Sequence, residues 1–191
     1  MVSPWSMTWL NEPPAWQEED GVLTVTTGDR TDFWRTTHYG FIRDDGHVYG
    51  QEVEGDFSAV VTFSGEYEAL YDQAGLMLRL DERHWIKAGI EYTDGKHHLS
   101  AVVTREFSDW SVLPLPATPR EVRLRISRYA ETVRIEYAMD EGPFAMLRLA
   151  YIPPGGPAFV GPMCCSPQRA GFRARFWDFR IGEPAKDLHA E

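Results

Sequence analysis

Two charged side chains interrupt a segment that is otherwise apolar enough for a protein interior. Lys87 and Glu91 lie four residues apart in "WIKAGIEY" (Trp85–Tyr92), among isoleucine, alanine and glycine. A sheltered carboxyl group can act as an acid or a base, and a sheltered ammonium group needs a partner or a ligand because an unpaired buried charge is costly. The segment therefore predicts a functional site, whose geometry depends on the elements that carry it.

Alternation along this segment predicts a strand with two different faces. Successive strand residues point to opposite sides, so Lys87 and Glu91 share a face that is separate from the isoleucine face. They are roughly 13 Å apart along the strand, too far to pair with each other. They could be two solvated residues on an open sheet, but Trp85 and Met77 on the same face favour a sheltered surface.

Strand register places further polar groups beside these two. Pairing Gln73 with Glu91 keeps the leucines of the preceding strand with the isoleucines in the core. The turn at Asp94–Gly95 is a strong hairpin signal and pairs Glu91 with His98. Gly75 and Gly89 lie on the same face between these polar residues and carry no side chain, so we expect a shallow trough there. The candidate ligand-binding residues are Gln73, Met77, Lys87, Glu91 and His98, with Trp34, His38 and Trp110 from neighbouring segments.

The rest of the chain predicts an all-β fold. "DFSAVVTF", "REVRLRISR" and "ETVRIEYAMDEGPFAMLRLAY" alternate apolar and polar residues with period two, which indicates a sheet with one solvated side. Residues 74–105 are apolar on both faces and are expected in the centre of a second sheet. "GFRARFWDFRI" predicts a last strand with a bulge at Phe176–Trp177, and "GQEVEGDF" reads as a turn. Two packed antiparallel sheets follow, as one domain over residues 1–183 with a tail over 184–191.

Composition restricts the partners and the compartment. The net charge of −10 disfavours nucleic acid, and no basic helix or long apolar run favours a membrane. The N-terminal "MVSPWSMTWL" lacks the pattern of a secretory signal. The two cysteines, Cys164 and Cys165, are adjacent, which makes an ordinary disulfide between them strained. We expect a cytoplasmic protein with reduced thiols and no cofactor, and a homodimer is left open.

Several long motifs resemble a known family. "WLNEPPAW", "TDFWRTTHYGF", "YDQAGLMLR", "WIKAGIEY", "LSAVVTREFSDWS" and "VGPMCCSPQRAGF" are similar to the YesU-like, "regulation of enolase" family, a domain of unknown function in the concanavalin A-like lectin/glucanase superfamily. The likeness runs from about Trp5 to Ile181. It implies a jelly-roll sandwich that binds carbohydrate on a concave face, with "TDFWRTTHYGF" forming a wall that offers Trp34, His38 and Tyr39. It implies no catalytic residue.

The residues favour binding over catalysis. Glycoside hydrolysis needs two carboxyl groups roughly 5–10 Å apart, and only Glu91 with Asp72 or Asp109 could supply them. Cys164 could be a nucleophile, although a cysteine in an apolar strand is more often inert. No metal site is expected from His97–His98, because adjacent strand residues face opposite ways. We predict a small carbohydrate or similar polyhydroxylated ligand. The alternatives are a glycosidase with Glu91 as acid or base and a regulatory module that binds another protein.

Overall fold

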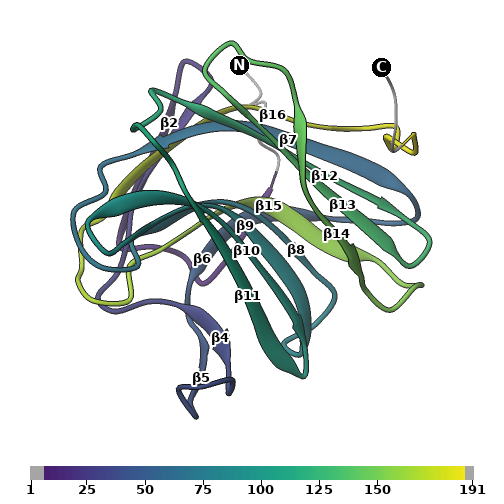
Figure 1. Ribbon diagram of the computed structural model, residues 1–191, viewed down its shortest axis with the longest axis horizontal. Helices are drawn as coiled ribbons and strands as arrows, with labels where there is room; N and C mark the ends of the chain where they lie inside the picture. Colours follow the sequence, from purple (N-terminus) through teal and green to yellow (C-terminus); the bar gives the residue numbers. More distant parts are fainter. Residues whose placement is uncertain (1–6, 188–191) are drawn as a thin grey trace.

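The structure is a computed structural model that describes residues 7–187, and every regular element within this range is a β-strand. The strands form two seven-stranded antiparallel sheets that pack face to face, and a small hairpin (Figure 1). The described range holds no helix that could cross a membrane. Residues 1–6 of the predicted domain and residues 188–191 of the predicted tail lie outside the described residues.

The two large sheets have the following strand orders. Sheet A contains β1 (Thr8–Leu10), β6 (His47–Val53), β15 (Ala158–Cys165), β8 (Gln73–Arg79), β9 (His84–Thr93), β10 (Lys96–Arg105) and β11 (Phe107–Pro114). Sheet B contains β14 (Ala145–Tyr151), β13 (Thr132–Met139), β12 (Val122–Tyr129), β7 (Phe57–Gly65), β16 (Arg173–Gly182), β3 (Val22–Thr26) and β2 (Ala15–Glu19). The hairpin consists of β4 (Phe33–Arg35) and β5 (Ile42–Asp44).

The main core lies between the two sheets, where the period-two pattern predicts it. Sheet A contributes Leu76, Leu78 and Ile86, and sheet B contributes Phe63 and Leu124, all without exposed surface. Each such side chain stabilises the fold by roughly 1.5–3 kcal/mol through removal of apolar surface from water. The sandwich of two antiparallel sheets predicted from the sequence is therefore confirmed.

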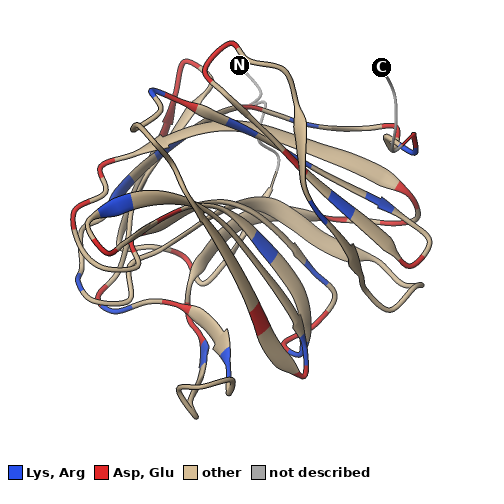
Figure 2. Ribbon diagram, viewed as in Figure 1, with Lys and Arg blue, Asp and Glu red and all other residues tan. Residues whose placement is uncertain are grey.

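The outer face of sheet B carries the predicted arginines. Figure 2 shows basic segments along β12 and β13, where arginines alternate with core residues. Arg125 forms two hydrogen bonds with Glu136 on the neighbouring strand, at 2.6 and 2.8 Å. Arg134, on the same strand as Glu136, also binds it, so these three charges are paired with one another.

The register predicted for the centre of sheet A is confirmed. Gln73 pairs with Glu91, and Glu91 pairs with His98. Gly75 and Gly89 lie opposite each other in the next row, and a Cβ atom on either would lie 1.9 Å from a backbone oxygen of the other strand. Glycine is required at these two positions because the backbones approach so closely.

Three local expectations differ from the structure. Residues 50–53 of the predicted turn "GQEVEGDF" belong to β6 and Phe57 begins β7, so only residues 54–56 turn. The irregularity in β16 falls between Trp177 and Arg180, slightly later than predicted, and coincides with the left-handed backbone of Asp178 (φ 53°). Part of the predicted tail contacts the sandwich, since Ala185 N–H donates to Ser58 Oγ at 2.9 Å. Each difference reflects tertiary pairing that a local pattern does not encode.

Candidate functional site

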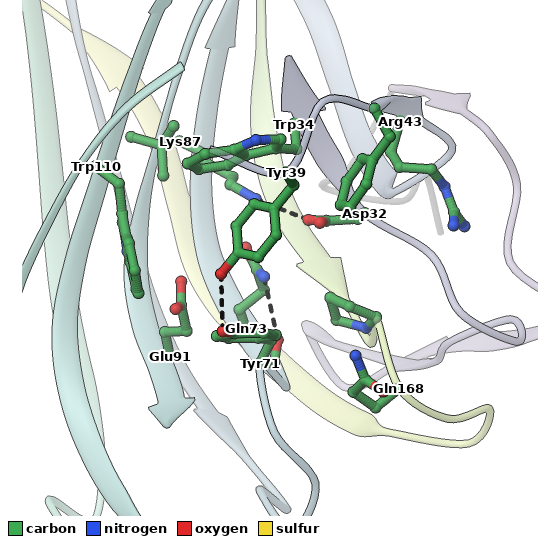
Figure 3. Close-up of a pocket in the computed structure, with 13 residues that line it drawn as sticks. Asp32, Trp34, Tyr39, Arg43, Tyr71, Gln73, Lys87, Glu91, Trp110 and Gln168 are labelled. Atoms are coloured by element: carbon green, nitrogen blue, oxygen red, sulfur yellow. Dashed lines mark hydrogen bonds and ion pairs between the residues drawn. The ribbon is translucent and has the colours of Figure 1, made fainter. Parts of the chain in front are cut away.

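A pocket of about 230 Å³ opens on the face of sheet A that points away from sheet B. The β4–β5 hairpin projects from the sandwich (Figure 1), and its Phe33 and Trp34 share a buried cluster with Met77 of β8, Trp85 of β9 and Val102 of β10. Figure 3 shows the side chains that converge there. The lining residues are Asp32, Trp34, Tyr39, Phe41, Arg43, Tyr71, Gln73, Lys87, Glu91, Val102, Trp110, Pro167 and Gln168.

Lys87 is the buried cation of the pocket floor, and its partner is Asp32. The Lys87 Nζ atom donates to Asp32 Oδ1 at 3.0 Å, and the lysine side chain is only 4% exposed. Burial alone would lower the pKa of Lys87, but attraction to Asp32 and Glu91 and the hydrogen bond to Asp32 outweigh burial and raise it. Lys87 therefore keeps its charge at neutral pH.

Backbone contacts fix the position of Asp32. Its backbone N–H donates to Asp45 Oδ1 at 2.9 Å, and its carbonyl oxygen accepts from the backbone N–H groups of Asp45 and Gly46. The N–H of Phe33 donates to Asp32 Oδ1 at 2.8 Å, beside the bond from Lys87. The turn between β5 and β6 thus aims this carboxylate at the floor of the pocket.

Glu91 is the second carboxyl group of the floor, and its environment differs from that of Asp32. Ser100 Oγ donates to Glu91 Oε2 at 3.1 Å and accepts from Trp110 Nε1 at 3.2 Å. Burial raises the pKa of Glu91 to about 7, although Lys87 and Ser100 oppose this. At neutral pH the carboxyl group is therefore partly protonated, and it can donate or accept a hydrogen bond.

Five aromatic side chains line the pocket around this polar floor: Trp34, Tyr39, Phe41, Tyr71 and Trp110. The rings of Trp34 and Trp110 meet edge to face at 6.5 Å, and Tyr71 meets Trp110 in the same way at 6.3 Å. Tyr39, at the tip of the hairpin, hydrogen-bonds Tyr71 through the two hydroxyl oxygens at 2.9 Å. This bond and burial raise the pKa of Tyr71 to about 12, so its hydroxyl stays protonated.

Tyr71 adopts an unusual backbone conformation. Its φ of 69° lies in the left-handed region, which a bulky residue rarely adopts and which costs roughly 1–3 kcal/mol. Its N–H donates to the carbonyl of Tyr92 at 2.6 Å, and its own carbonyl accepts from Gln73 Nε2 at 3.1 Å. These contacts hold the strained residue in place and direct it toward the pocket.

A buried ion pair beneath the pocket fixes the segment that carries Pro167 and Gln168. Asp72 is fully buried, accepts from Ser166 Oγ at 2.5 Å and binds Arg169 Nη2 at 2.6 Å. Burial alone would raise the pKa of Asp72, but hydrogen bonds from Arg169, Ser166 and two backbone N–H groups outweigh burial and lower it. Asp72 therefore has a structural role and does not face Glu91 as a second acid.

The structure brings five of the eight candidate ligand-binding residues to this pocket, namely Trp34, Gln73, Lys87, Glu91 and Trp110. Met77 and His98 lie on the predicted face of sheet A and His38 lies in the hairpin, but none of the three lines the pocket. Met77 is fully buried in a small second core under the hairpin. His98 Nδ1 lies 3.1 Å from the carbonyl oxygen of Lys96, and His38 lies on the exposed hairpin tip against the Tyr39 ring.

Seven lining residues were not identified as site residues from the sequence: Asp32, Phe41, Arg43, Tyr71, Val102, Pro167 and Gln168. Asp32 lies in the "TDFWRTTHYGF" motif directly before β4, but nothing in its local pattern indicates a partner 55 residues away. Tyr71 stands two residues before Gln73, at the end of the turn that precedes β8, and no periodic pattern marks it. Gln168 follows a proline in a loop and carries no periodic signal at all.

The other chemistries weighed from the sequence find no matching geometry among residues 7–187. Asp109 is 60% exposed and pairs with Arg148. Both cysteines are free and buried, and burial raises the pKa of each thiol, which disfavours the reactive thiolate. Among these described residues, no three His, Cys, Asp or Glu side chains gather as a metal site would require.

Comparison with known proteins places this chain among relatives of the same size. It is 43% identical over 183 residues to "Regulation of enolase protein 1" of Saccharomyces cerevisiae, which covers 95% of this chain and 92% of the yeast protein. The crystal structure of a functionally unknown protein from S. cerevisiae has a TM-score of 0.90 and 43% identity, over 93% of this chain and 96% of that chain.

A more distant structure shares the fold alone. The Bacteroides ovatus protein described as "Xyloglucan PUL GH43B" has a TM-score of 0.67 at 22% identity, over 87% of this chain but only 35% of its own chain. Residues 9–184 match the family described as "Protein of unknown function (DUF1349)". Because this match spans nearly all of the described residues, the chain belongs to the DUF1349 family.

Proposed function

We propose that this chain binds a sugar, or a similar polyhydroxylated ligand, in the pocket beneath the β4–β5 hairpin. The observation that carries the proposal is one recess that combines aromatic walls with a charged and polar floor (Figure 3). Sugars have apolar C–H faces that pack on aromatic rings and hydroxyl groups that need paired donors and acceptors. Trp34, Tyr39, Tyr71 and Trp110 supply the rings.

The polar floor retains unused hydrogen-bonding capacity. Glu91 uses one carboxyl oxygen for Ser100, and Gln73 uses its amide N–H for Tyr71. The other oxygen of Glu91 and the amide oxygen of Gln73 have no hydrogen-bond partner within residues 7–187. Neither atom is fully enclosed by the protein, so both are open to the pocket that their residues line. Polar atoms in a recess bind water or a ligand when no protein group reaches them, so a ligand with several hydroxyl groups fits this floor.

The fold is compatible with this function but does not carry the proposal. We infer that the chain belongs to the concanavalin A-like lectin/glucanase superfamily, in line with the resemblance of its sequence motifs. The B. ovatus neighbour has a name that refers to xyloglucan, yet at 22% identity the likeness extends to the fold alone. The proposal therefore depends on the pocket of this chain.

A glycan array followed by calorimetry tests the proposal. The wild-type protein should bind at least one glycan, and Trp110→Ala should weaken that binding at least tenfold because an aromatic wall is removed. Trp16→Ala is the matched control, because Trp16 is 39% exposed against 36% for Trp110 and lies on β2, outside the pocket. Binding that is equal in both variants, or absent from the wild type, would refute the proposal.

Acid catalysis on the bound sugar is the second candidate, and the state of Glu91 favours it. A carboxyl group with a pKa of about 7 is suited to protonate a leaving oxygen, and Asp32 supplies a second carboxylate in the same pocket. Glu91→Gln separates the two candidates. A hydrolase would lose release of reducing ends while still binding glycan, whereas a binding protein would release none in either form.

A further inference from the structure

We infer that this pocket takes one uncharged sugar ring, either a free monosaccharide or the last residue of a chain, and holds two neighbouring hydroxyl groups between Asp32 and Lys87. The inference rests on the proposed sugar-binding function and narrows it to a ligand class. Three properties of the recess lead to it: its size, the arrangement of free donors and acceptors on its floor, and its charge balance.

The size and closure of the recess limit the ligand to one ring. Its volume of about 230 Å³ lies below the roughly 300–1,000 Å³ of pockets that hold drug-sized ligands. Figure 3 shows Trp110 on one side and Asp32 with Arg43 on the other, while Tyr39 reaches across to Tyr71. A polymer that lies along the sheet needs two open ends, and these side chains obstruct such a path.

The ion pair on the floor presents a free acceptor beside free donors. Asp32 Oδ1 accepts from Lys87 and from the N–H of Phe33, whereas Oδ2 has no partner within residues 7–187. Lys87 has three N–H donors and uses one of them on Asp32. One sugar hydroxyl can donate to Asp32 Oδ2 while its neighbour accepts from Lys87, and both are charge-assisted hydrogen bonds.

The charge balance of the pocket disfavours an acidic sugar. The lining includes two cations within the described part of the chain, and each already binds a carboxylate: Lys87 binds Asp32, and Arg43 binds Asp45 at 2.9 Å. Glu91 adds another carboxyl group without a cation of its own. A uronate would bring a further negative charge to a pocket with no unpaired cation, and would meet repulsion from Asp32 and Glu91.

Calorimetry on the wild-type protein tests the inference without any variant. The neutral probes are the monosaccharides D-glucose, D-galactose, D-mannose and D-xylose and the β-1,4-linked trisaccharides of glucose, mannose and xylose. The acidic probes are D-glucuronate and D-galacturonate, and all titrations are made at pH 8. At least one neutral monosaccharide should bind within tenfold of its trisaccharide, and the uronates should bind at least tenfold more weakly than glucose or galactose. A trisaccharide that binds more than a hundredfold tighter than its monosaccharide, or a uronate that binds best, would overturn the inference.

Deoxy derivatives of the best-binding monosaccharide test the hydroxyl contacts. Loss of either of two adjacent hydroxyl groups should weaken binding at least tenfold, because the buried partner is left without a hydrogen bond. If no single deoxy derivative binds more than threefold more weakly than the parent sugar, the assignment of the two hydroxyl groups to Asp32 and Lys87 is wrong. Long glycans that bind through Trp110 while single rings do not would leave the proposed function intact and overturn only this inference.

Discussion

Lys87 Nζ and Asp32 Oδ1 lie 3.0 Å apart although 55 residues separate them in the chain. The lysine comes from the centre of sheet A and the aspartate from the segment that leads into the β4–β5 hairpin. This pair joins the hairpin to the sheet and places a charged group at the floor of a recess between them. The candidate site exists because this long-range contact forms.

Loss of Asp32 should destabilise the protein more than loss of an exposed ion-pair partner. Asp32→Asn leaves Lys87 sheltered and without a counter-charge, which should lower the free energy of unfolding by about 3–5 kcal/mol. Urea denaturation at pH 7 measures the change. Arg83→Met is the control, since Arg83 and Glu106 form an exposed pair whose loss should cost at most about 1 kcal/mol. Equal losses would contradict a buried role for the Lys87–Asp32 pair.

The titration of Glu91 should make folding stability depend on pH near neutrality. The folded protein holds a proton on Glu91 between pH 4.5 and about 7, whereas the unfolded chain releases it. The contribution of Glu91 is therefore fully present below pH 4.5 and is lost as the pH rises to about 7. The titratable groups that face Glu91 are Lys87, Asp32, Tyr71 and His98, its partner on β10, and Lys87 and Tyr71 keep one charge state in this range.

Glu91→Gln should remove this pH dependence. Between pH 4.5 and pH 8, the free energy of unfolding of the wild type should fall by about 3 kcal/mol relative to the variant. Chemical denaturation at several pH values measures the difference. For Glu52→Gln, at an exposed position on β6, the free energy of unfolding should change with pH in the same way as in the wild type. If the free energy of unfolding of Glu91→Gln follows the same pH dependence as the wild type, the carboxyl group is ionised in the folded protein throughout this range.

Asp72 should stabilise the pocket segment and make the fold sensitive to acid. Its lowered pKa means that its contribution is present above the unfolded value of 3.8 and is lost as the pH falls through the folded value. Asp72→Asn should lower the free energy of unfolding by about 3–5 kcal/mol at pH 7. Below pH 4, the variant should lose less stability with falling pH than the wild type does. The exposed Asp29→Asn serves as control, and unchanged acid sensitivity in Asp72→Asn would contradict this role.

Gly89 should tolerate no side chain. A Cβ atom there would lie 1.9 Å from the carbonyl oxygen of Ala74, so Gly89→Ala should separate β8 from β9 and cost about 3 kcal/mol or more. Gly182→Ala is the matched control because nothing lies within 4 Å of its Cβ position. Thermal unfolding followed by circular dichroism compares the two. A variant at position 89 with the same Tm as the control would show that the strands are not this close.

The floor of the site could be predicted from the sequence because its determinants are local. Side-chain parity, the Asp94–Gly95 turn and the need to keep leucines with isoleucines were sufficient to fix the pairing of Gln73, Glu91 and His98. The walls could be predicted only in part. Trp34 and Trp110 were identified as aromatic residues near polar strands, without knowledge of how far they stand apart.

The depth of each residue could not be predicted, because it depends on segments distant in sequence. Met77 shares the face of Lys87, yet Phe33 and Trp34 from the hairpin region cover it completely. Asp32 was missed because its position depends on Asp45 and on backbone contacts of the hairpin region, and no periodicity encodes these contacts. The alternation of side chains along a strand predicts which face of the sheet a residue occupies. The hairpin region that covers this face determines which side chains can reach a ligand.

Saturation-transfer difference NMR tests the central claim most directly, with the intact protein and an equimolar mixture of D-glucose, D-galactose, D-mannose, D-xylose and L-arabinose. At least one sugar should receive saturation from the protein, and the signal should disappear in Trp110→Ala and persist in Trp16→Ala. If neither these sugars nor the β-1,4-linked trisaccharides of glucose, mannose and xylose receive saturation, or if the signal survives in Trp110→Ala, the recess above Lys87 and Asp32 is not a sugar-binding site.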